Sequence, residues 1–357
     1  MENSKKVLIA PLHWGMGHTT RCMPIITLML QQQYTVYVAA TAAQRALLEQ
    51  EYTQLHYITS PTVTVVYGKH KWHTIYKLFG VANAFVRNIK KEHSWLQQVV
   101  QQYGIQVVLS DNRYGLYTPL CHTIFITHQL QPRNVLGTIA IRLVQKKLYQ
   151  YINQYHACWV LDEPKPHHIA GTLSHPKLMP TIPTTYIGIT TRLTKVNGII
   201  LYKLCVLLSG PEPQRGILEH IILAQLPQLQ VPYVLVRGVA SNAVTIPNTP
   251  YSTHYNHLTA TALSLVIAQS TYVLCRSGYT TIMDMLLLGK QCILVPTPGQ
   301  SEQEYLANYL HHKGLALAIQ QHALHLHTAL HLANTYTYVP YTTPQSSILK
   351  QAVQSLQ

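Results

Sequence analysis

The sequence is short of charge, above all of acidic residues. Only 11 % of its 357 residues are charged, against about 25 % in a typical globular protein. Twelve Asp and Glu stand against 26 Lys and Arg, and the formal net charge of +14 favours anionic partners such as nucleotide diphosphates, acidic lipid surfaces or nucleic acid. Hydrophobic residues make up 47 % of the chain, so the low charge content does not indicate disorder.

Other absences exclude whole classes of protein. The six cysteines form no CxxC pair and four lie in apolar runs, so we expect reduced core thiols in a reducing compartment. Val7–Pro11 is too short for the hydrophobic region of a signal peptide. The longest later run, Gly198–Leu208, is interrupted by Lys203 and predicts a buried strand, since a membrane span needs about 20 apolar residues. We therefore expect a cytoplasmic protein.

Short apolar runs alternate with helical stretches along the chain. Strands are predicted at Val7–Pro11, Thr35–Ala40, Val107–Ser110, Thr123–Thr127, Cys158–Leu161, Cys205–Ser209, Tyr233–Val236, Tyr272–Cys275 and Cys292–Pro296. Helices are predicted at Arg21–Gln33, Ala42–Glu51, Ile89–Tyr103, Ile139–Gln154, Arg215–Leu226, Leu258–Ala268, Thr281–Leu288 and Glu302–His312. Continuous apolar strands separated by helices are typical of a parallel sheet covered on both faces.

Because this pattern occurs twice, we predict an α/β protein with two doubly wound, Rossmann-like domains that face a cleft. The first domain would span residues 1–188. A polar, Thr-rich linker, 189–198, would lead to a second domain at 199–340. Residues 341–357 would form a C-terminal helix, and whether it returns to the first domain is open.

The C-terminal region is rich in histidine, which raises the question of a metal site. His312, His322, His325, His327 and His331 are close in sequence, but no HExxH glutamate and no Cys or Asp partner is nearby. A chain with 21 histidines clusters some by chance. No DxD-like pair occurs either, so we predict no metal and no cofactor.

A glycine-rich turn that ends in histidine follows the first predicted strand. Gly15 and Gly17 allow a sharp turn and a close approach of a ligand to the backbone, although the spacing is not that of the dinucleotide fingerprint. His18 would lie at or just before a helix N-terminus, where the helix dipole keeps its imidazole neutral. It could accept a hydroxyl proton there or merely cap the helix, and the turn does not decide between the two.

A second strand-to-helix turn follows Cys275. It contains Arg276, Ser277, Gly278 and Thr280. The unpaired N–H groups of such a turn bind anions, so a diphosphate would fit without a metal. Asp284, the only acid between Glu219 and Glu302, could accept hydrogen bonds from two ribose hydroxyls. The alternative is that it balances the dipole of its helix.

Two further turns fit the same pocket. Ser209 and Arg215 flank a turn after a predicted strand and could face a phosphate. Gln303 and Glu304 open a later helix, where their side chains could hydrogen-bond sugar hydroxyls. For both turns, ordinary turn chemistry is the alternative.

Together these residues resemble those of glycosyltransferase family 28, the family of the peptidoglycan UDP-N-acetylglucosamine transferases. The resemblance is most specific from Val273 to Leu315, where Asp284 replaces a ribose-binding Glu and Gln303-Glu304 replaces a sugar-binding Gln pair. The Gly15–His18 segment is similar to the family's Gly-rich loop, whose His lies beside the acceptor. Ser209-Gly210-Pro211-Glu212 stands where the family has a Gly-Gly-Ser loop.

The ends of two N-terminal strands are similar to those of a less characterised bacterial branch of the family. This similarity adds Asn112, Arg113 and His128 to Gly15 and Gly17 on the acceptor side. Asp111 also ends a strand and is the only acid between Glu92 and Asp162. It would either orient His18 or bind the acceptor, and both roles remain open.

The resemblance implies an inverting, metal-independent glycosyltransferase with His18 as the base. The donor would be a nucleotide diphosphate sugar, a UDP-hexose or UDP-N-acetylhexosamine, and the acceptor a glycan or a lipid-linked molecule. The departures at Asp284 and Glu304 leave the donor sugar open. Alternatives are a UDP-N-acetylglucosamine 2-epimerase-like enzyme and a non-catalytic sugar-nucleotide-binding subunit. Nucleic-acid binding ranks last, because the basic residues belong to no known nucleic-acid module.

A basic, aromatic segment extends from Lys69 to Trp95. It would either lie on an anionic membrane surface at the inner face of the membrane or form a core helix with solvated lysines. The sequence does not decide between these interpretations.

Overall fold

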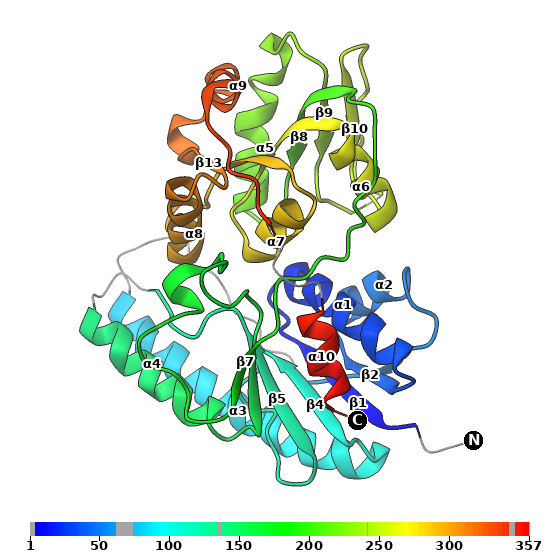
Figure 1. The fold of residues 1–357 in the computed structure, drawn as a ribbon, viewed down its shortest axis with the longest axis vertical. Helices are drawn as coiled ribbons and strands as arrows, with labels where there is room; N and C mark the ends of the chain where they lie inside the picture. The colour runs from blue at the N-terminus through cyan, green and yellow to red at the C-terminus, as the bar shows by residue number, and fades with distance from the viewer. Residues whose placement is uncertain (1–3, 62–73, 134–137, 241, 343–346, 357) are drawn as a thin grey trace.

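The protein has two parallel β-sheets with helices on both faces of each, as Figure 1 shows for the computed structural model. The structure describes residues 4–61, 74–133, 138–240, 242–342 and 347–356. The predicted α/β class with two doubly wound domains is confirmed.

The N-terminal sheet has the strand order β3-β2-β1-β4-β5-β6-β7. Its strands are β1 (Lys6–Pro11), β2 (Thr35–Ala39), β3 (His56–Ile58), β4 (Val107–Asp111), β5 (His122–Thr127), β6 (Ala157–Val160) and β7 (Thr184–Tyr186). The helices of this part are α1 (Met16–Gln31), α2 (Ala42–Leu48), α3 (Thr74–Tyr103), α4 (Thr138–Ile152) and the 3₁₀ turn η1 (Gly171–Leu173).

The C-terminal sheet has the order β10-β9-β8-β11-β12-β13. Its strands are β8 (Tyr202–Leu207), β9 (Tyr233–Val236), β10 (Ser252–Tyr255), β11 (Ser270–Cys275), β12 (Gln291–Leu294) and β13 (Leu317–Ala318). The helices are α5 (Gln214–Leu223), α6 (Ala260–Ala268), α7 (Tyr279–Leu287), α8 (Ser301–His312), α9 (Leu326–Thr335) and α10 (Ile348–Gln354), with 3₁₀ turns η2 (Leu226–Gln228) and η3 (Gln321–Ala323).

The central strands are apolar along their length because both of their faces are buried. On β1, Val7 and Ile9 belong to the core on the α1 side, whereas Leu8 and Ala10 belong to the core under α3. Alternate side chains of a strand point to opposite faces, so a strand between two helical layers needs an unbroken apolar run. This is why the central strands were predicted and the short edge strands β3, β7, β10 and β13 were not.

Several bounds differ from the sequence prediction, among them the start of α3 at Thr74 rather than at Ile89. Helix α1 begins at Met16, before the predicted Arg21, so His18 lies in its first turn. The predicted buried strand at Gly198–Leu208 begins only at Tyr202, and Ile199 is 83 % exposed. Residues before β8 still belong to the connection between the domains, where the Leu201 N–H donates to the Gln269 carbonyl at the end of α6.

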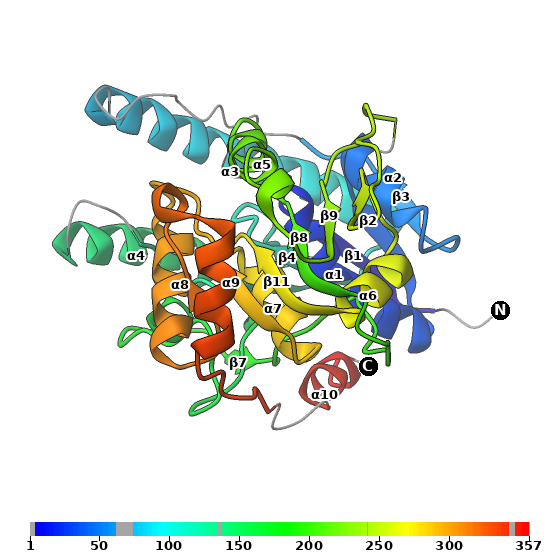
Figure 2. The same ribbon diagram turned by 90° about the horizontal axis from the view of Figure 1, so that it is seen from above.

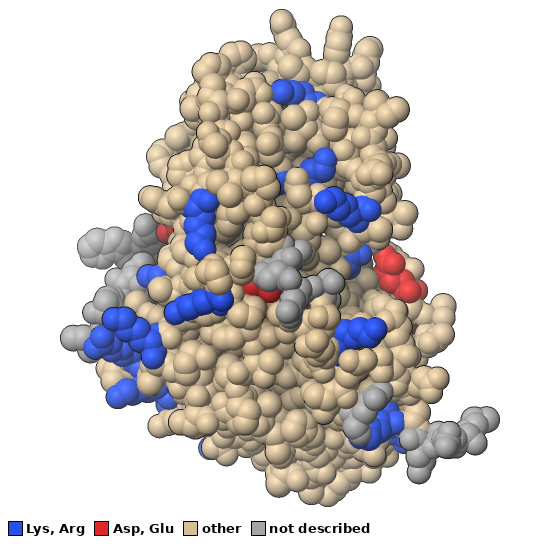
Figure 3. Space-filling view, viewed as in Figure 1, with Lys and Arg blue, Asp and Glu red and all other residues tan. Residues whose placement is uncertain are grey.

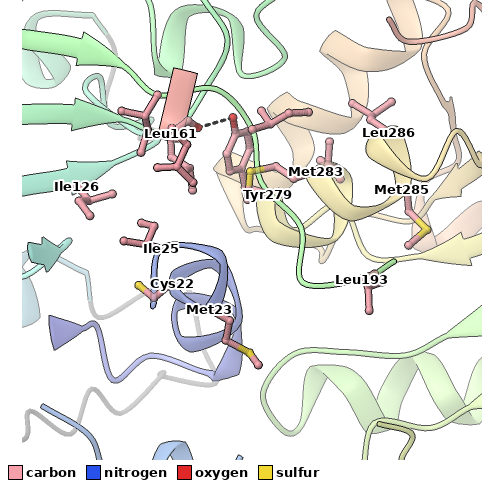
Figure 4. Packing of buried hydrophobic residues seen from close by; sticks show 14 of the residues in the cluster. Cys22, Met23, Ile25, Ile126, Leu161, Leu193, Tyr279, Met283, Met285 and Leu286 are labelled. Carbon is pink, nitrogen blue, oxygen red and sulfur yellow. Dashed lines mark hydrogen bonds between the residues drawn. The ribbon is translucent and has the colours of Figure 1, made fainter. Parts of the chain in front are cut away.

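The two domains share one apolar core at their boundary. Figure 4 shows Cys22 and Ile25 of α1 on one side of this cluster, and Tyr279 and Met283 of α7 on the other. At the C-terminus, α10 packs against α1 of the N-terminal domain (Figures 1 and 2). The carboxyl ends of both sheets therefore face each other, and the turns that follow the strands meet there.

The surface carries few acidic side chains, as the sequence composition requires. In Figure 3, basic side chains are scattered over both domains, and the few acidic ones lie near the level where the domains meet. Among the described residues, we find no helix that combines the length and the apolar character needed to cross a membrane.

Candidate active site

His18 and Asp111 form a hydrogen-bonded pair at the carboxyl edge of the N-terminal sheet. Asp111 is the last residue of β4 and is fully buried, and His18 comes from the first turn of α1. Their Nδ1 and Oδ2 atoms are 2.8 Å apart. The pair uses Nδ1 of His18, so Nε2 is the ring nitrogen left to accept a proton from a substrate.

Arg21, one turn along α1, binds the same carboxylate with two nitrogens. Its Nε donates to Asp111 Oδ2 at 3.0 Å, and its Nη2 donates to Oδ1. Burial alone would raise the pKa of Asp111, but Arg21 and His18 hold it at about 2. Burial and the nearby Arg21 also lower the pKa of His18. At neutral pH the pair is therefore a carboxylate and a neutral imidazole.

The hydrogen bonds continue from Arg21 across the domain boundary. Arg21 Nη1 donates to His128 Nδ1 at 2.9 Å, and His128 Nε2 lies 3.0 Å from Oε1 of Glu302 in α8. The ring of His128 stacks on that of Tyr279, with centroids 4.3 Å apart. Tyr279 in turn donates to the Leu161 carbonyl, the bond dashed in Figure 4.

The N-termini of α1 and α7 touch at the same place. Thr280, in the first turn of α7, donates through Oγ1 to the Gly17 carbonyl at 3.1 Å. Gly278 caps α7, and a Cβ added there would meet no atom within 4 Å. The unpaired N–H groups that begin α7 thus open onto free space beside the turn that carries His18, as an anion site requires.

Arg276 supplies a buried positive charge behind the α7 N-terminus. It is 2 % exposed, and its guanidinium donates to the carbonyls of Val295, Pro296 and Gln214. Within the described part of the chain, no carboxylate forms an ion pair with it. Burial lowers the pKa of Arg276 to about 10, so it stays charged at neutral pH. This uncompensated charge favours an anion at the carboxyl ends of β11 and β12.

Asp284 lies farther along α7 and faces the segment that joins the domains. It is partly buried and accepts a hydrogen bond of 2.6 Å from Thr191 Oγ1. Burial raises the pKa of Asp284 to about 6, against the opposing effects of Thr191 and Arg192. The carboxylate is therefore held near the domain boundary rather than in bulk solvent.

The remaining donor-side residues differ in what they do. Ser209 is partly exposed after β8. Arg215 is bound by Glu212 and Glu219, at 2.5 and 2.8 Å, so its charge is already balanced, unlike that of Arg276. Because two nearby glutamates satisfy its guanidinium, the structure gives no support for a phosphate contact by Arg215.

Three further predicted residues shape the turns at the start of α7 and α8. Ser277 Oγ donates to the Gln303 carbonyl at 2.9 Å. The side chains of Gln303 and Glu304 accept from the N–H groups of Thr297 and Gly299. These bonds fix the turn before α8 beside the α7 N-terminus, where both side chains remain partly exposed.

The predicted acceptor-side residues fall into two groups. His128 belongs to the network with His18, and Gly15 has a φ of 78° at the start of α1, a conformation that favours glycine. Asn112 adopts a φ of 54° in the turn after β4. Arg113 is buried, and its Nε donates to Glu92 at 2.9 Å. It therefore holds α3 onto the sheet instead of facing a ligand.

Sequence reasoning missed Arg21, Tyr279 and Glu302. Arg21 carried a weak signal, as a cation among the apolar residues of its helix. Glu302 directly precedes the predicted pair Gln303-Glu304 and is one of only 12 acids. Nothing in the sequence joined it to His128, which is 174 positions away.

Two predictions concern other parts of the chain. Among the described residues, no group of three His, Cys, Asp or Glu side chains is placed to hold a metal ion.

Lys69 to His73, the most basic and aromatic part of the segment predicted at Lys69–Trp95, lie outside the described residues.

Comparison with known proteins supports the resemblance read from the sequence. Residues 240–354 match the glycosyltransferase family 28 C-terminal domain. Over 128 residues the chain is 30 % identical to UDP-N-acetylglucosamine--N-acetylmuramyl-(pentapeptide) pyrophosphoryl-undecaprenol N-acetylglucosamine transferase of Histophilus somni (strain 129Pt). This match covers 33 % of the chain and 36 % of that protein, so the chain spans about a third of the curated relative.

Solved structures share the fold over nearly the whole chain. The glycosyltransferase SnogD from Streptomyces nogalater gives a TM-score of 0.63 at 14 % identity, covering 99 % of this chain and 94 % of its own. The Streptomyces sp. SF2575 glycosyltransferase SsfS6, complexed with thymidine diphosphate, gives 0.59 at 13 % identity with the same coverage. MurG from Acinetobacter baumannii gives 0.53 at 14 % identity, again with that coverage. The predicted fold of two Rossmann-like domains, called the GT-B fold in glycosyltransferases, is thus confirmed.

Proposed function

We propose that the protein is an inverting, metal-independent glycosyltransferase that uses a UDP-hexose or a UDP-N-acetylhexosamine. The observation that carries the proposal is the contact between Thr280 and Gly17. It brings the anion-binding start of α7 against the turn that bears the His18–Asp111 pair. A candidate base and a candidate diphosphate site would thereby be adjacent, which transfer from a nucleotide sugar requires.

The residues of the N-terminal side would handle the proton. Nε2 of His18 takes the proton of the acceptor hydroxyl while that oxygen forms a bond to the anomeric carbon. The bond from this carbon to the diphosphate oxygen breaks, and the nucleoside diphosphate leaves with the electron pair. Attack from the face opposite the leaving group inverts the configuration. Asp111 then stabilises the imidazolium through Nδ1–H, as the acid of a His–Asp pair does.

The residues of the C-terminal side would bind the donor. The N–H groups at the start of α7, with Gly278 and Thr280, and the charge of Arg276 would hold the diphosphate and stabilise its growing charge without a metal. Asp284 would exchange its bond from Thr191 for bonds from ribose hydroxyls. Gln303 and Glu304 would face the sugar.

Calorimetric titration with UDP-, GDP- and dTDP-sugars tests this proposal directly. We expect micromolar to millimolar binding of UDP-sugars without added metal, and weaker binding after Asp284→Ala. An absence of binding to every nucleotide sugar would overturn the proposal. Binding without transfer to any glycan or lipid acceptor would instead favour a non-catalytic sugar-nucleotide-binding subunit.

The acceptor side also offers a basic surface for a lipid-linked acceptor at an anionic membrane. Helices α3 and α4 lie side by side, with the rings of Phe85 and Tyr151 6.3 Å apart. Their exposed cations are Arg87, Lys90, Lys91, Arg142, Lys146 and Lys147. Leu143, between them, is 64 % exposed. Basic residues around exposed apolar ones are typical of a peripheral membrane contact, and co-sedimentation with anionic vesicles at low salt tests it.

A further inference from the structure

Five polar side chains form one continuous hydrogen-bonded chain across the domain boundary. In order they are His18, Asp111, Arg21, His128 and Glu302. The first four belong to the N-terminal domain. Glu302 alone comes from the C-terminal domain, in the first turn of α8. This series of hydrogen bonds is therefore complete only while the two domains are packed against each other.

The partners fix the position of every proton in this chain. Arg21 can only donate, so Nδ1 of His128 must accept, and the proton of the neutral ring lies on Nε2. That N–H donates to Glu302 at 3.0 Å. Ionised Asp111 can only accept, so Nδ1 of His18 donates to it and Nε2 carries the lone pair. The same tautomer of His18 is the one that a base needs.

We propose that Glu302 is a positioning residue by which the C-terminal domain holds His18 ready to accept a proton. Glu302 holds the ring of His128 by accepting from its Nε2–H, His128 accepts from Arg21 through Nδ1, and Arg21 stays bound to Asp111. The inference rests on the proposed role of His18 as the base. Since Gln303 follows Glu302 in α8, the sugar-binding region and the support of the base would share one helix start.

The charges around the chain favour the same arrangement. Asp111 and Glu302 are carboxylates and Arg21 is a cation, so these five side chains together carry one net negative charge while both imidazoles are neutral. The Cys22 thiol lies 3.8 Å from Asp111 Oδ2 and stays protonated, since burial and Asp111 raise its pKa. The aromatic ring of Tyr279 covers His128. The net negative charge therefore stabilises a proton that arrives on His18.

The test compares Glu302→Ala and Glu302→Gln with a matched control, Tyr305→Phe. Tyr305 lies on the same helix, and its hydroxyl accepts from the Thr172 N–H across the same boundary at 2.9 Å. It makes no hydrogen bond to the five side chains of the series. Nitrogen NMR of ¹⁵N-histidine-labelled protein reads each tautomer without a substrate. Hydrolysis of UDP-N-acetylglucosamine, with water as the acceptor, reads turnover.

We expect Glu302→Ala to shift the nitrogen signal of His128 Nε2, whose N–H loses its acceptor, and to lower hydrolysis about 10-fold, because the base remains but is poorly held. The acidic limb of the pH profile should move to lower pH, since a negative charge is lost. Glu302→Gln, which keeps an acceptor, should restore the Nε2 signal, and Tyr305→Phe should change neither readout. UDP affinity should be the same in all variants.

An unchanged His128 Nε2 signal and an unchanged pH profile in Glu302→Ala would overturn the inference, and so would equal effects of Glu302→Ala and Tyr305→Phe. If the wild-type protein neither binds nor hydrolyses the nucleotide sugar, the proposed function fails instead. The ring-nitrogen signals of His18 and His128 still report on Glu302 in that case. Should Glu302→Ala fail to fold, the pH profile of Glu302→Gln decides alone.

Discussion

Asp111 and Arg276 stand at corresponding places in the two domains and carry opposite charges. The order β3-β2-β1-β4-β5-β6 of one sheet repeats in the order β10-β9-β8-β11-β12-β13 of the other, so β4 corresponds to β11. Asp111 ends β4, and Arg276 directly follows β11. Both side chains are buried, with exposed fractions of 0 % and 2 %.

Their surroundings differ in one respect. Asp111 is matched by Arg21 and His18 within its own domain, whereas the described partners of Arg276 are neutral carbonyls. A charge that is balanced inside the protein holds other side chains in place. A buried charge left unbalanced is costly for folding and favours a ligand of opposite sign. Under the proposed function, one domain therefore orients the base and the other binds the anionic donor.

The largest effect should come from His18, the proposed base, which is bound by Asp111. We expect His18→Ala to lower transfer by roughly 10² to 10⁴ while calorimetry shows unchanged UDP binding, because His18 belongs to the acceptor side. Turnover at the wild-type rate would remove His18 from the mechanism. Weakened UDP binding would contradict the division between the domains.

Next in size is the loss of stability on removal of the matched charge. Asp111→Asn leaves Arg21 buried without its carboxylate, and breaking such a pair costs about 3–5 kcal/mol. Chemical denaturation of the variant and the wild type measures this difference. The pH dependence of the stability should have a matching sign. The pKa of Asp111 is about 2 in the folded protein, which is below its ordinary value of 3.8. The stabilisation is thus present above pH 4 and is lost as pH falls toward 2.

The corresponding substitution in the C-terminal domain, at Arg276, should affect UDP binding rather than stability. Arg276→Gln removes an unbalanced buried charge, so the free energy of unfolding should be unchanged or higher. UDP binding should weaken about 10- to 100-fold, the size of a lost hydrogen bond to a charged group. A variant that loses stability and keeps its UDP affinity would show that Arg276 is structural like Asp111.

The smallest effect should be the pH dependence of donor binding. Because the pKa of Asp284 is about 6 without a ligand, the carboxylate proposed to accept ribose hydroxyls is mostly ionised at pH 7 and mostly protonated at pH 5. UDP affinity should therefore fall about tenfold over this interval. Calorimetry on Asp284→Asn provides the control, since this variant should lose the dependence.

Much of the fold, and the positions of several candidate site residues in it, followed from local patterns. The central strands and the turns after them were predictable because burial on both faces demands apolar runs, and turn residues mark their ends. The ion pairs of Arg113 and Arg215 were not predicted. Glu92, which binds Arg113 over 21 positions, lies on α3, and the sequence pattern does not orient this helix against the turn after β4. Glu219 binds Arg215 from four positions along the same helix, α5, and this spacing is visible in the sequence once the helix is assigned.

The sequence by itself determined two Rossmann-like units and put His18, Asp111, Arg276 and Asp284 at the ends of strands or on the helices that follow them. The tertiary structure alone decided which of these groups meet. Glu302 reaches His128 over 174 positions, and Thr280 reaches Gly17 over 263, only because the carboxyl ends of two sheets face each other. Apolar periodicity is a local property of the chain, whereas the pairing of polar side chains depends on how whole domains dock.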